Sequence, residues 1–164
     1  MTITLDPQAK KAVLRQFTYG LHAVTAAHDG ERGVFTANWL TQVSFDPPLI
    51  ALSVELESST LPLIRTSGRF AVCPLAEGQR ELAGALGRPK SKAGDKFEAA
   101  DLHVLETESG VPVLADALGW IACQVISEIP AGDSVLLLAE VIEAAVQHDG
   151  EPLSMRTAGF RHAG

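Results

Sequence analysis

The residues best suited to chemistry lie in a polar segment between two hydrophobic runs, FTANWLTQVSFDPP at 35–48. Amide side chains at Asn38 and Gln42, neighbouring hydroxyl groups and the indole of Trp39 occupy one passage from a strand into a loop. A planar redox ring needs an apolar wall, polar groups along one edge and backbone N–H donors where negative charge develops. This segment contains all three kinds of group. A polar corner, with Asn38 in a turn and Trp39 in the core, is the alternative interpretation.

Three consecutive hydroxyl residues, Ser58, Ser59 and Thr60, precede a predicted helix. The free N–H groups and the dipole at the start of a helix favour anions, so this turn is a candidate phosphate site. Ordinary capping of the helix by a hydroxyl side chain explains the same residues equally well. The pattern therefore indicates either a phosphate anchor or a simple helix cap.

A basic segment, GRPKSKAGDK at 87–96, stands out within an acidic chain of formal net charge -7. Arg88, Lys90, Lys92 and Lys96 are accompanied there by a single acidic residue. A mobile arm that closes on a phosphate group is one interpretation of this cluster. A solvated surface loop is the other.

The standard motifs of covalent, nucleotide and metal chemistry do not occur in the sequence. It contains no G-x-G-x-x-G, no G-x-x-x-x-G-K-[ST] and no G-x-S-x-G. Cys73 and Cys123 lie in apolar runs, which favours buried thiols over a disulfide. The histidines lack metal-ligand spacing, so we expect no metal site. We also expect no catalytic side chain, and infer that any enzyme activity depends on a bound cofactor.

The composition bounds the class of protein. With 164 residues, 46% hydrophobic and 20% charged, the chain suits one domain spanning 1–164. Its pI of about 5.1 argues against nucleic acid as a partner, because phosphate contacts need clustered Lys and Arg. No apolar run reaches the roughly 18–20 residues of a membrane span, and the first residues have no apolar signal core. We therefore expect a cytoplasmic protein with no membrane partner.

Periodicity and turn signals predict a mainly β protein with short helices. The run at 49–52, apolar on consecutive positions, predicts a strand covered on both faces. Because strands and helices do not alternate regularly, a closed or partly open β-barrel is favoured over a doubly wound sheet. We expect helices over 7–16, 58–68 and 77–87, and strands over 18–27, 34–40, 47–56, 69–75, 101–106, 118–128 and 134–148.

Taken together, these segments resemble the flavin reductase-like family, whose members are FMN-binding proteins with a split β-barrel. The matching stretches run in family order over roughly residues 15–155. They include TANWLTQVSFDPPLIALSVE, SSTLPLIRTSGRFAVCPLAEGQRELA and GWIACQVISEIPAGDSVLLLAEVIEA. The resemblance implies a split barrel of the FMN-binding type as the fold.

The resemblance also implies a set of cofactor-binding residues. The segment after the second strand would line the flavin ring, the following strand would contact the ribityl chain, and the hydroxyl turn with the basic segment would hold the phosphate. FMN is the expected flavin, with FAD as the alternative, near the interface of a homodimer. The implied residues are Thr36, Ala37, Asn38, Trp39, Thr41, Gln42, Ser53, Val54, Ser58, Ser59, Thr60, Arg88 and Lys92.

By the same resemblance, the activity is flavin reduction. NADH or NADPH would pass a hydride from the nicotinamide C4 to the flavin N5, and a flavin-dependent monooxygenase or electron-transfer partner would receive the reduced flavin. Trp39 is bulkier than the residue common at this position in the family. The sequence does not decide whether its indole narrows the space for the nicotinamide. Two alternatives remain: a flavin-binding electron-transfer or storage protein, and a cofactor-free barrel that serves as a binding module.

Overall fold

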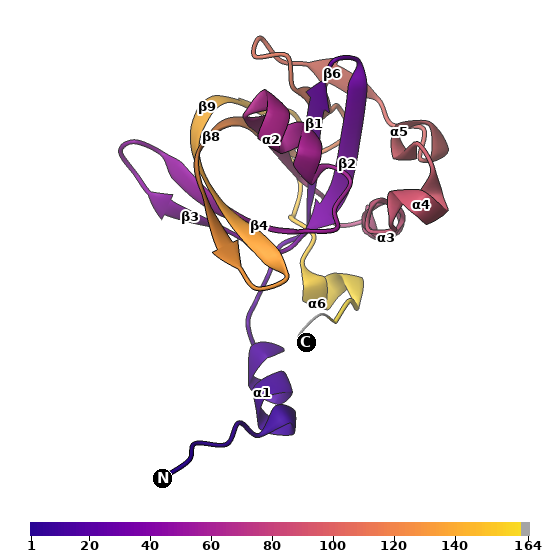
Figure 1. Ribbon diagram of the computed structural model, residues 1–164. Helices are drawn as coiled ribbons and strands as arrows, with labels where there is room; N and C mark the ends of the chain where they lie inside the picture. The colour runs from indigo at the N-terminus through magenta and orange to yellow at the C-terminus, as the bar shows by residue number, and fades with distance from the viewer. Residues whose placement is uncertain (162–164) are drawn as a thin grey trace.

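A strongly curved antiparallel sheet forms the body of the protein in the computed structural model, which describes residues 1–161 (Figure 1). Its seven strands lie in the order β2-β1-β5-β8-β9-β4-β3. A separate two-stranded hairpin, β6-β7, lies beside β1 and β5. The strands are β1 His22–His28, β2 Glu31–Ala37, β3 Leu40–Ser44, β4 Leu49–Glu55, β5 Arg69–Pro74, β6 Val104–Glu106, β7 Pro112–Leu114, β8 Gly119–Ala131 and β9 Ser134–Val146.

The sheet does not close into a complete barrel, and the two strands that border the gap are consecutive in the chain. β2 and β3 are the two edge strands, and they are not paired with each other in the described residues. Asn38 and Trp39 connect the end of β2 to the start of β3. These two residues therefore cross the split of the barrel. The architecture confirms the predicted fold, a mainly β split barrel with short helices.

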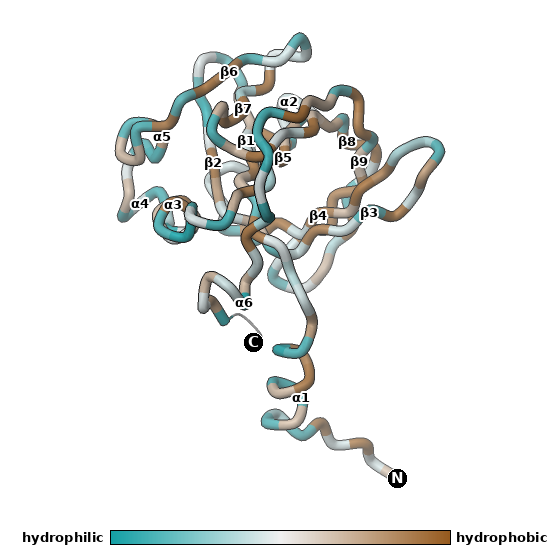
Figure 2. Tube along the Cα trace, turned by 180° about the vertical axis from the view of Figure 1, so that it is seen from behind, coloured by the Kyte–Doolittle hydropathy of each residue, from teal (hydrophilic) through white to brown (hydrophobic). Residues whose placement is uncertain are grey.

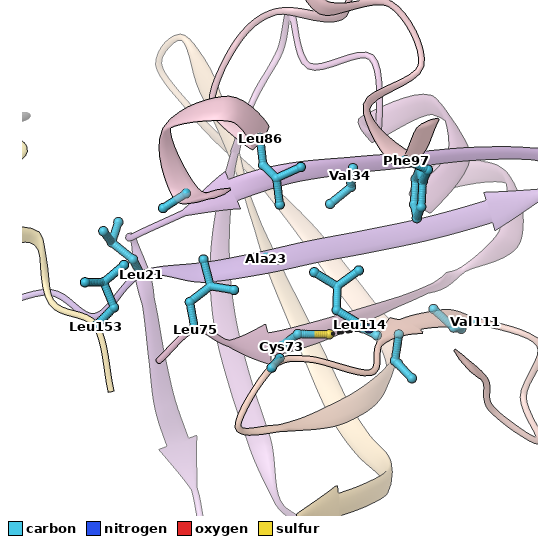
Figure 3. Close-up of a cluster of buried hydrophobic side chains, with 14 of the residues drawn as sticks. Leu21, Ala23, Val34, Cys73, Leu75, Leu86, Phe97, Val111, Leu114 and Leu153 are labelled. Atoms are coloured by element: carbon cyan, nitrogen blue, oxygen red, sulfur yellow. Dashed lines mark hydrogen bonds between the residues drawn. The ribbon is translucent and has the colours of Figure 1, made fainter. Parts of the chain in front are cut away.

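Two hydrophobic cores lie on opposite faces of the central strands. Side chains such as Val24, Phe70 and Leu137 fill the inside of the barrel. On the outer face, Ala23 and Cys73 pack with residues of α3, α5 and β7 (Figure 3). Adjacent residues of β1 reach different cores because side chains alternate across a strand. This double burial holds β1 and its partner β2 firmly in place.

Short helices cover the barrel in the described residues (Figures 1 and 2). The helix α2 contacts β1, β2 and β5, whereas α3 and α5 cover β2. The helix α1 extends away from the barrel in both views and has no buried residue. No helix of residues 1–161 has the length and hydrophobicity needed to span a membrane. The helices are α1 Pro7–Leu14, α2 Leu61–Ser67, α3 Arg80–Leu86, α4 Lys90–Ala93, α5 Lys96–Ala99 and α6 Met155–Ala158.

Local signals in the sequence located most of these elements correctly. The dipeptide Asp29-Gly30, a typical hairpin-turn signal, joins β1 to β2, with Asp29 at φ 49 and Gly30 at φ 79. Such a pair of positive φ values matches the twist of a two-residue hairpin. Gly68, at φ 71, ends α2 as predicted. The predicted single domain over 1–164 includes three residues outside the described part, and it stays a prediction.

Several expectations were wrong in detail. The chain between the second and third predicted strands contains a further short strand, β3, where only a loop was expected. The basic segment, predicted as a loop, contains the single-turn helices α4 and α5. The strand β4 alternates between buried and half-buried residues, so it is not equally covered on both faces. Four-residue elements carry too little periodicity to be recognised from a sequence window.

Candidate functional site

A cavity of about 440 Å³ opens beside the split of the barrel. The end of β2 with its connection to β3, the segment after β4, and the segment after α3 form its walls. Nine predicted site residues meet there: Thr36, Ala37, Asn38, Trp39, Ser53, Ser58, Ser59, Thr60 and Arg88. Residues from three distant parts of the chain thus form one site, which we call the split cavity.

Four predicted site residues lie elsewhere. Val54 is buried inside the barrel core, because it points to the opposite face of β4 from Ser53. Thr41 and Gln42 line a different cavity, described below. Lys92 is exposed on α4 and does not line the split cavity. Alternation along the strand accounts for Val54, and the single-turn helix α4 accounts for the position of Lys92.

One end of the split cavity has the features that suit a planar ring. The Asn38 Nδ2 atom is buried and has no hydrogen-bond partner among the described residues. An unpaired buried amide is costly, and an acceptor supplied by a ligand would satisfy it. β2 is an edge strand, so it pairs with a neighbouring strand along one side only. The Thr36 hydroxyl is not available, since it donates to the Ala83 carbonyl.

The hydroxyl turn lies at the other end of the cavity. The Thr60 N–H donates to Ser58 Oγ at 3.3 Å, and the Leu61 N–H donates to the Ser58 carbonyl at 3.2 Å. Thr60 is the N-cap residue of α2, but its side chain makes no capping bond. Simple side-chain capping by Thr60 therefore does not explain the turn. Of the three hydroxyl residues, only Ser59 is exposed.

Gly33 allows the turn to pack against β2. A Cβ atom at this position would lie 2.6 Å from Thr60 Oγ1 and 3.2 Å from Leu63 Cδ1. Both distances are shorter than ordinary van der Waals contacts. The close approach of β2 to the turn therefore depends on glycine at position 33. This contact sets the distance between the strand and the Ser58–Thr60 turn.

Lys96 is the best-positioned cation of the site, and it was not among the predicted site residues. Its Nζ atom donates to the carbonyls of Leu86 at 2.7 Å and Val34 at 3.1 Å. The side chain is half-buried, and this burial lowers the pKa of its ammonium group. The two carbonyls fix the charge between β2 and the end of α3. The sequence identified Lys96 as a member of the basic segment, but it did not show which cation of that segment lies at the cavity.

Acidic and basic side chains both line the split cavity. Arg88, Lys90 and Lys96 supply positive charge, whereas Glu55 and Glu57 supply negative charge. Neither glutamate was predicted; Glu55 is the last residue of β4 and Glu57 follows it. The cations come from the basic segment after α3. This segment therefore gives the cavity its means of holding an anionic group.

A second cavity, of about 530 Å³, lies where β1 and β4 begin, and we call it the mouth cavity. Most of its lining is apolar, with His22, Thr41 and Gln42 as the polar members. Burial lowers the pKa of His22 from its ordinary 6.5 to about 4. The His22 Nδ1 atom is buried and has no hydrogen-bond partner among residues 1–161. The imidazole is therefore neutral at neutral pH.

The two cysteines are free and buried, as expected. Burial raises the pKa of Cys73 to about 11 and that of Cys123 to about 12. The Leu114 N–H donates to the Cys73 sulfur at 3.5 Å (Figure 3). Neither thiol has the depressed pKa of a reactive cysteine. Among the residues that the structure describes, no group of three or more His, Cys, Asp and Glu side chains is placed to hold a metal ion.

Comparison with known proteins gives consistent similarities. A flavin reductase of Pseudomonas putida is 32% identical over 95% of this chain and 89% of its own length. The reductase component of a 4-nitrophenol monooxygenase from Rhodococcus opacus is 33% identical, over 96% and 82% respectively. The chain spans 42% of a probable flavin reductase of Rhizobium meliloti at 32% identity.

A solved structure agrees with these sequence similarities. The flavin reductase PheA2 superimposes with a TM-score of 0.80 at 27% identity, over 98% of this chain and 99% of that protein. The family described as the flavin reductase like domain matches residues 14–164. These findings confirm the predicted resemblance and the predicted class, an oxidoreductase that acts on flavin. The chain therefore belongs to the flavin reductase-like family.

Proposed function

We propose that the protein binds flavin in the split cavity and uses NADH or NADPH to reduce it. The observation that carries this proposal is that the two ends of the split cavity differ in chemical character. At one end lie an unpartnered amide and an edge strand, and at the other lie an exposed hydroxyl and three cations, of which Lys96 is held by two carbonyls. A flavin mononucleotide has the same polarity, with a planar ring at one end and a phosphate at the other.

The chain offers a distinct group for each part of the flavin. Asn38 and the backbone of Thr36 and Ala37 would hold the polar edge of the ring, and Ser53 would contact the ribityl chain. The phosphate would be held by Ser59 together with Arg88, Lys90 and Lys96. FMN is the minimal ligand that uses all three regions. Charge-assisted bonds from these cations would supply much of the affinity.

When bound, the flavin supplies the hydride-accepting ring that the side chains of this protein cannot provide. The residues of the chain bind, orient and exclude water, and none is assigned as a catalytic acid or base. Trp39 is 37% exposed at the cavity, so its indole would limit the space available to the nicotinamide. We assign the transfer from nicotinamide C4 to flavin N5 by analogy with the family.

The proposed partners follow from the family. Relatives from Rhodococcus opacus and Mycobacterium tuberculosis are named as reductase components of monooxygenases. This supports a flavin-dependent monooxygenase as the acceptor of reduced flavin. A homodimer is also proposed, because Val43 on the edge strand β3 and Phe45 directly after it are exposed apolar residues. Elution volume with light scattering would test the dimer independently of activity.

The decisive experiment is an anaerobic absorbance spectrum of the purified protein with FMN, recorded before and after addition of NADH or NADPH. We expect FMN to bind, and its visible absorbance to bleach with one of the two donors. Bound flavin that neither donor bleaches would contradict the reductase proposal and support electron transfer or storage. Failure to bind either FMN or FAD would support a cofactor-free binding module.

A further inference from the structure

A third cavity, of about 460 Å³, lies between the two ends of the described chain, and we call it the terminal cavity. One wall is formed by the end of α1 and the segment that leads to β1, and the other by α6 and the residues after it. Figures 1 and 2 show both helices at the same end of the barrel. None of its described lining residues belongs to the split cavity or the mouth cavity. The terminal cavity is therefore a separate candidate site.

Backbone hydrogen bonds hold the two walls of the terminal cavity together. The Met155 N–H donates to the Tyr19 carbonyl at 2.9 Å, and the Leu21 N–H donates to the Leu153 carbonyl at 2.8 Å. The segment before β1 and the start of α6 are thus paired, although they come from opposite ends of the sequence. This pairing fixes the spacing of the walls where the two segments meet.

Aromatic rings line the terminal cavity from both walls. Phe17 and Tyr19 belong to the first wall, and Phe160 belongs to the second. Arg80 of α3 holds the second wall, because its Nε atom donates to the Ala158 carbonyl and its guanidinium carbon lies 5.2 Å from the centroid of the Phe160 ring. Phe160 is half-buried, whereas Phe17 is 56% exposed. These rings offer apolar surface to a planar aromatic ligand.

The charged residues in this lining are all arginines. Arg15, Arg156 and Arg161 line the terminal cavity, and its described lining residues include no acidic residue. Within residues 1–161, no hydrogen bond or ion pair engages these three guanidinium groups. Arg65, by contrast, is bound to the Glu128 carboxylate. In a chain of formal net charge -7, three unpaired arginines around one cavity create a local preference for an anion.

We propose that the terminal cavity binds a small aromatic carboxylate. A guanidinium group matches the two oxygens of a carboxylate, and the aromatic rings would contact the planar apolar body of the ligand. The cavity volume of about 460 Å³ lies within the usual range for small-molecule sites, roughly 300–1,000 Å³. An aliphatic anion would leave the rings unused, and a neutral aromatic molecule would leave the arginines unused. The inference does not depend on the proposed flavin site.

The nicotinamide donor also combines aromatic rings with anionic groups. Its nicotinamide must lie against the flavin, whereas the terminal cavity has no described lining residue in common with the split cavity. An aromatic carboxylate needs only the groups of the terminal cavity. This is the reason for choosing it over the nicotinamide donor.

The probe for the test is 4-fluorobenzoate, and its binding to the full chain is measured by fluorine NMR. We expect saturable binding that weakens as NaCl increases, because salt screens exposed charges. The neutral analogue 4-fluorobenzamide should bind about tenfold more weakly, the scale of one charge-assisted hydrogen bond. Acetate at the same concentration should not displace the probe. Equal affinity of the acid and the amide, or displacement by acetate, would overturn the inference.

Arg156→Gln is the main variant, and it should weaken 4-fluorobenzoate binding about tenfold while leaving FMN affinity within about twofold. Arg156→Lys keeps the charge without the guanidinium group and should restore only part of the affinity. Arg88→Gln is the matched control at the split cavity, and it should weaken FMN binding without changing 4-fluorobenzoate binding. Urea unfolding shows whether each variant is folded. Unchanged 4-fluorobenzoate affinity in Arg156→Gln would refute the site.

Competition separates this ligand from the nicotinamide donor. Displacement of the probe by NADH or NADPH, with a raised KM for that donor in Arg156→Gln, would assign the cavity to the donor and overturn the inference. Reduction of FMN by a protein that does not bind 4-fluorobenzoate would overturn this inference alone. Binding of 4-fluorobenzoate without binding of flavin would support it while the proposed function fails.

Discussion

The split cavity and the mouth cavity lie on either side of one short passage of chain, yet they differ in chemical character. Thr36 to Trp39 face the first, whereas Thr41 and Gln42 face the second. The split cavity gathers three cations and the hydroxyl turn. The mouth cavity is mostly apolar and contains a histidine whose charged form is disfavoured. One is suited to an anionic ligand, and the other excludes charge.

The difference shows that the type of a residue does not by itself determine whether its side chain is available to a ligand. Asn38 and Gln42 are similar amides four positions apart, but they serve different cavities. The Gln42 amide donates to the Ser44 carbonyl at 3.2 Å, whereas the Asn38 amide has no partner among the described residues. The crossing from β2 to β3 separates them. An unsatisfied amide in the same cavity as the held Lys96 ammonium is the reason for proposing the split cavity as the flavin site.

The largest effect should follow from replacing Lys96 by methionine. This change leaves the Val34 and Leu86 carbonyls without their donor and removes the fixed charge of the split cavity. We expect the free energy of unfolding to fall by about 3 kcal/mol, since each unsatisfied buried acceptor costs about 1–3 kcal/mol. Flavin affinity should fall at least tenfold. Urea unfolding and flavin titration measure the two effects.

Lys92→Met is the matched control, because Lys92 is an exposed lysine of the same segment. It should change neither stability nor flavin affinity appreciably. Equal effects of the two variants would show that Lys96 has no special position. Flavin affinity would then depend no more on the charge at the split cavity than on a charge elsewhere on the surface.

The next effect concerns the mouth cavity and pH. The pKa of His22 is lowered by burial from 6.5 to about 4, so the unfolded chain binds the proton more readily. Stability from this residue is therefore complete above about pH 6.5 and falls as pH decreases toward 4. The loss should reach about 2–3 kcal/mol, since one pKa unit corresponds to about 1.4 kcal/mol.

The measurement is the difference in unfolding free energy between the unmodified protein and His22→Gln across pH 4–7. Taking this difference removes the contribution of carboxylates that titrate in the same range. The same pH slope in both proteins would refute the assignment of His22 as a neutral buried group.

Charge reversal should have a smaller effect, and the effect should depend on salt. Arg88→Glu with Lys90→Glu places two carboxylates at the split cavity, and we expect a loss of about 1–2 kcal/mol of flavin affinity at low ionic strength. The loss should shrink as salt increases, because screening weakens interactions between exposed charges. Lys92→Glu reverses a charge outside the lining and should have much less effect. A loss independent of salt would contradict an electrostatic role.

The smallest effect should follow from Ser59→Ala. Ser59 is the exposed hydroxyl of the turn and lines the split cavity. Removing one hydrogen bond to a charged acceptor should weaken binding of FMN and FAD by about 1.5 kcal/mol each. Ser127→Ala, at a serine outside the lining of the split cavity, is the control. Unchanged affinity in Ser59→Ala would remove Ser59 from the proposed phosphate site.

Most strands and the hairpin turn were predictable because their signals are local. Alternation of apolar residues predicts a strand, and Asp29-Gly30 supplies the positive φ values of the turn. The strand β3 was missed because its residues Thr41, Gln42 and Val43 are exposed and show no buried alternation. The helix α6 was missed for a related reason, since one turn of helix carries almost no periodicity.

The site was predictable only in part. The hydroxyl turn and the polar segment were found as motifs, and the family resemblance brought them together. Which basic side chain enters the cavity was not predictable, since Lys92 and Lys96 are four residues apart in one charged run. Lys96 is selected by the carbonyls of Val34 and Leu86, which come from other elements. Sequence spacing holds no information about those two acceptors.

The amino-acid sequence therefore determined the family, the mainly β class and the segments from which a site would be made. These properties depend on neighbouring residues: alternation, turn chemistry and clustered charge. The tertiary structure alone decided that the polar passage divides between two cavities and that Lys96 is a positioned cation. Such properties depend on strand order and on contacts between distant segments, which come into existence only when the chain folds.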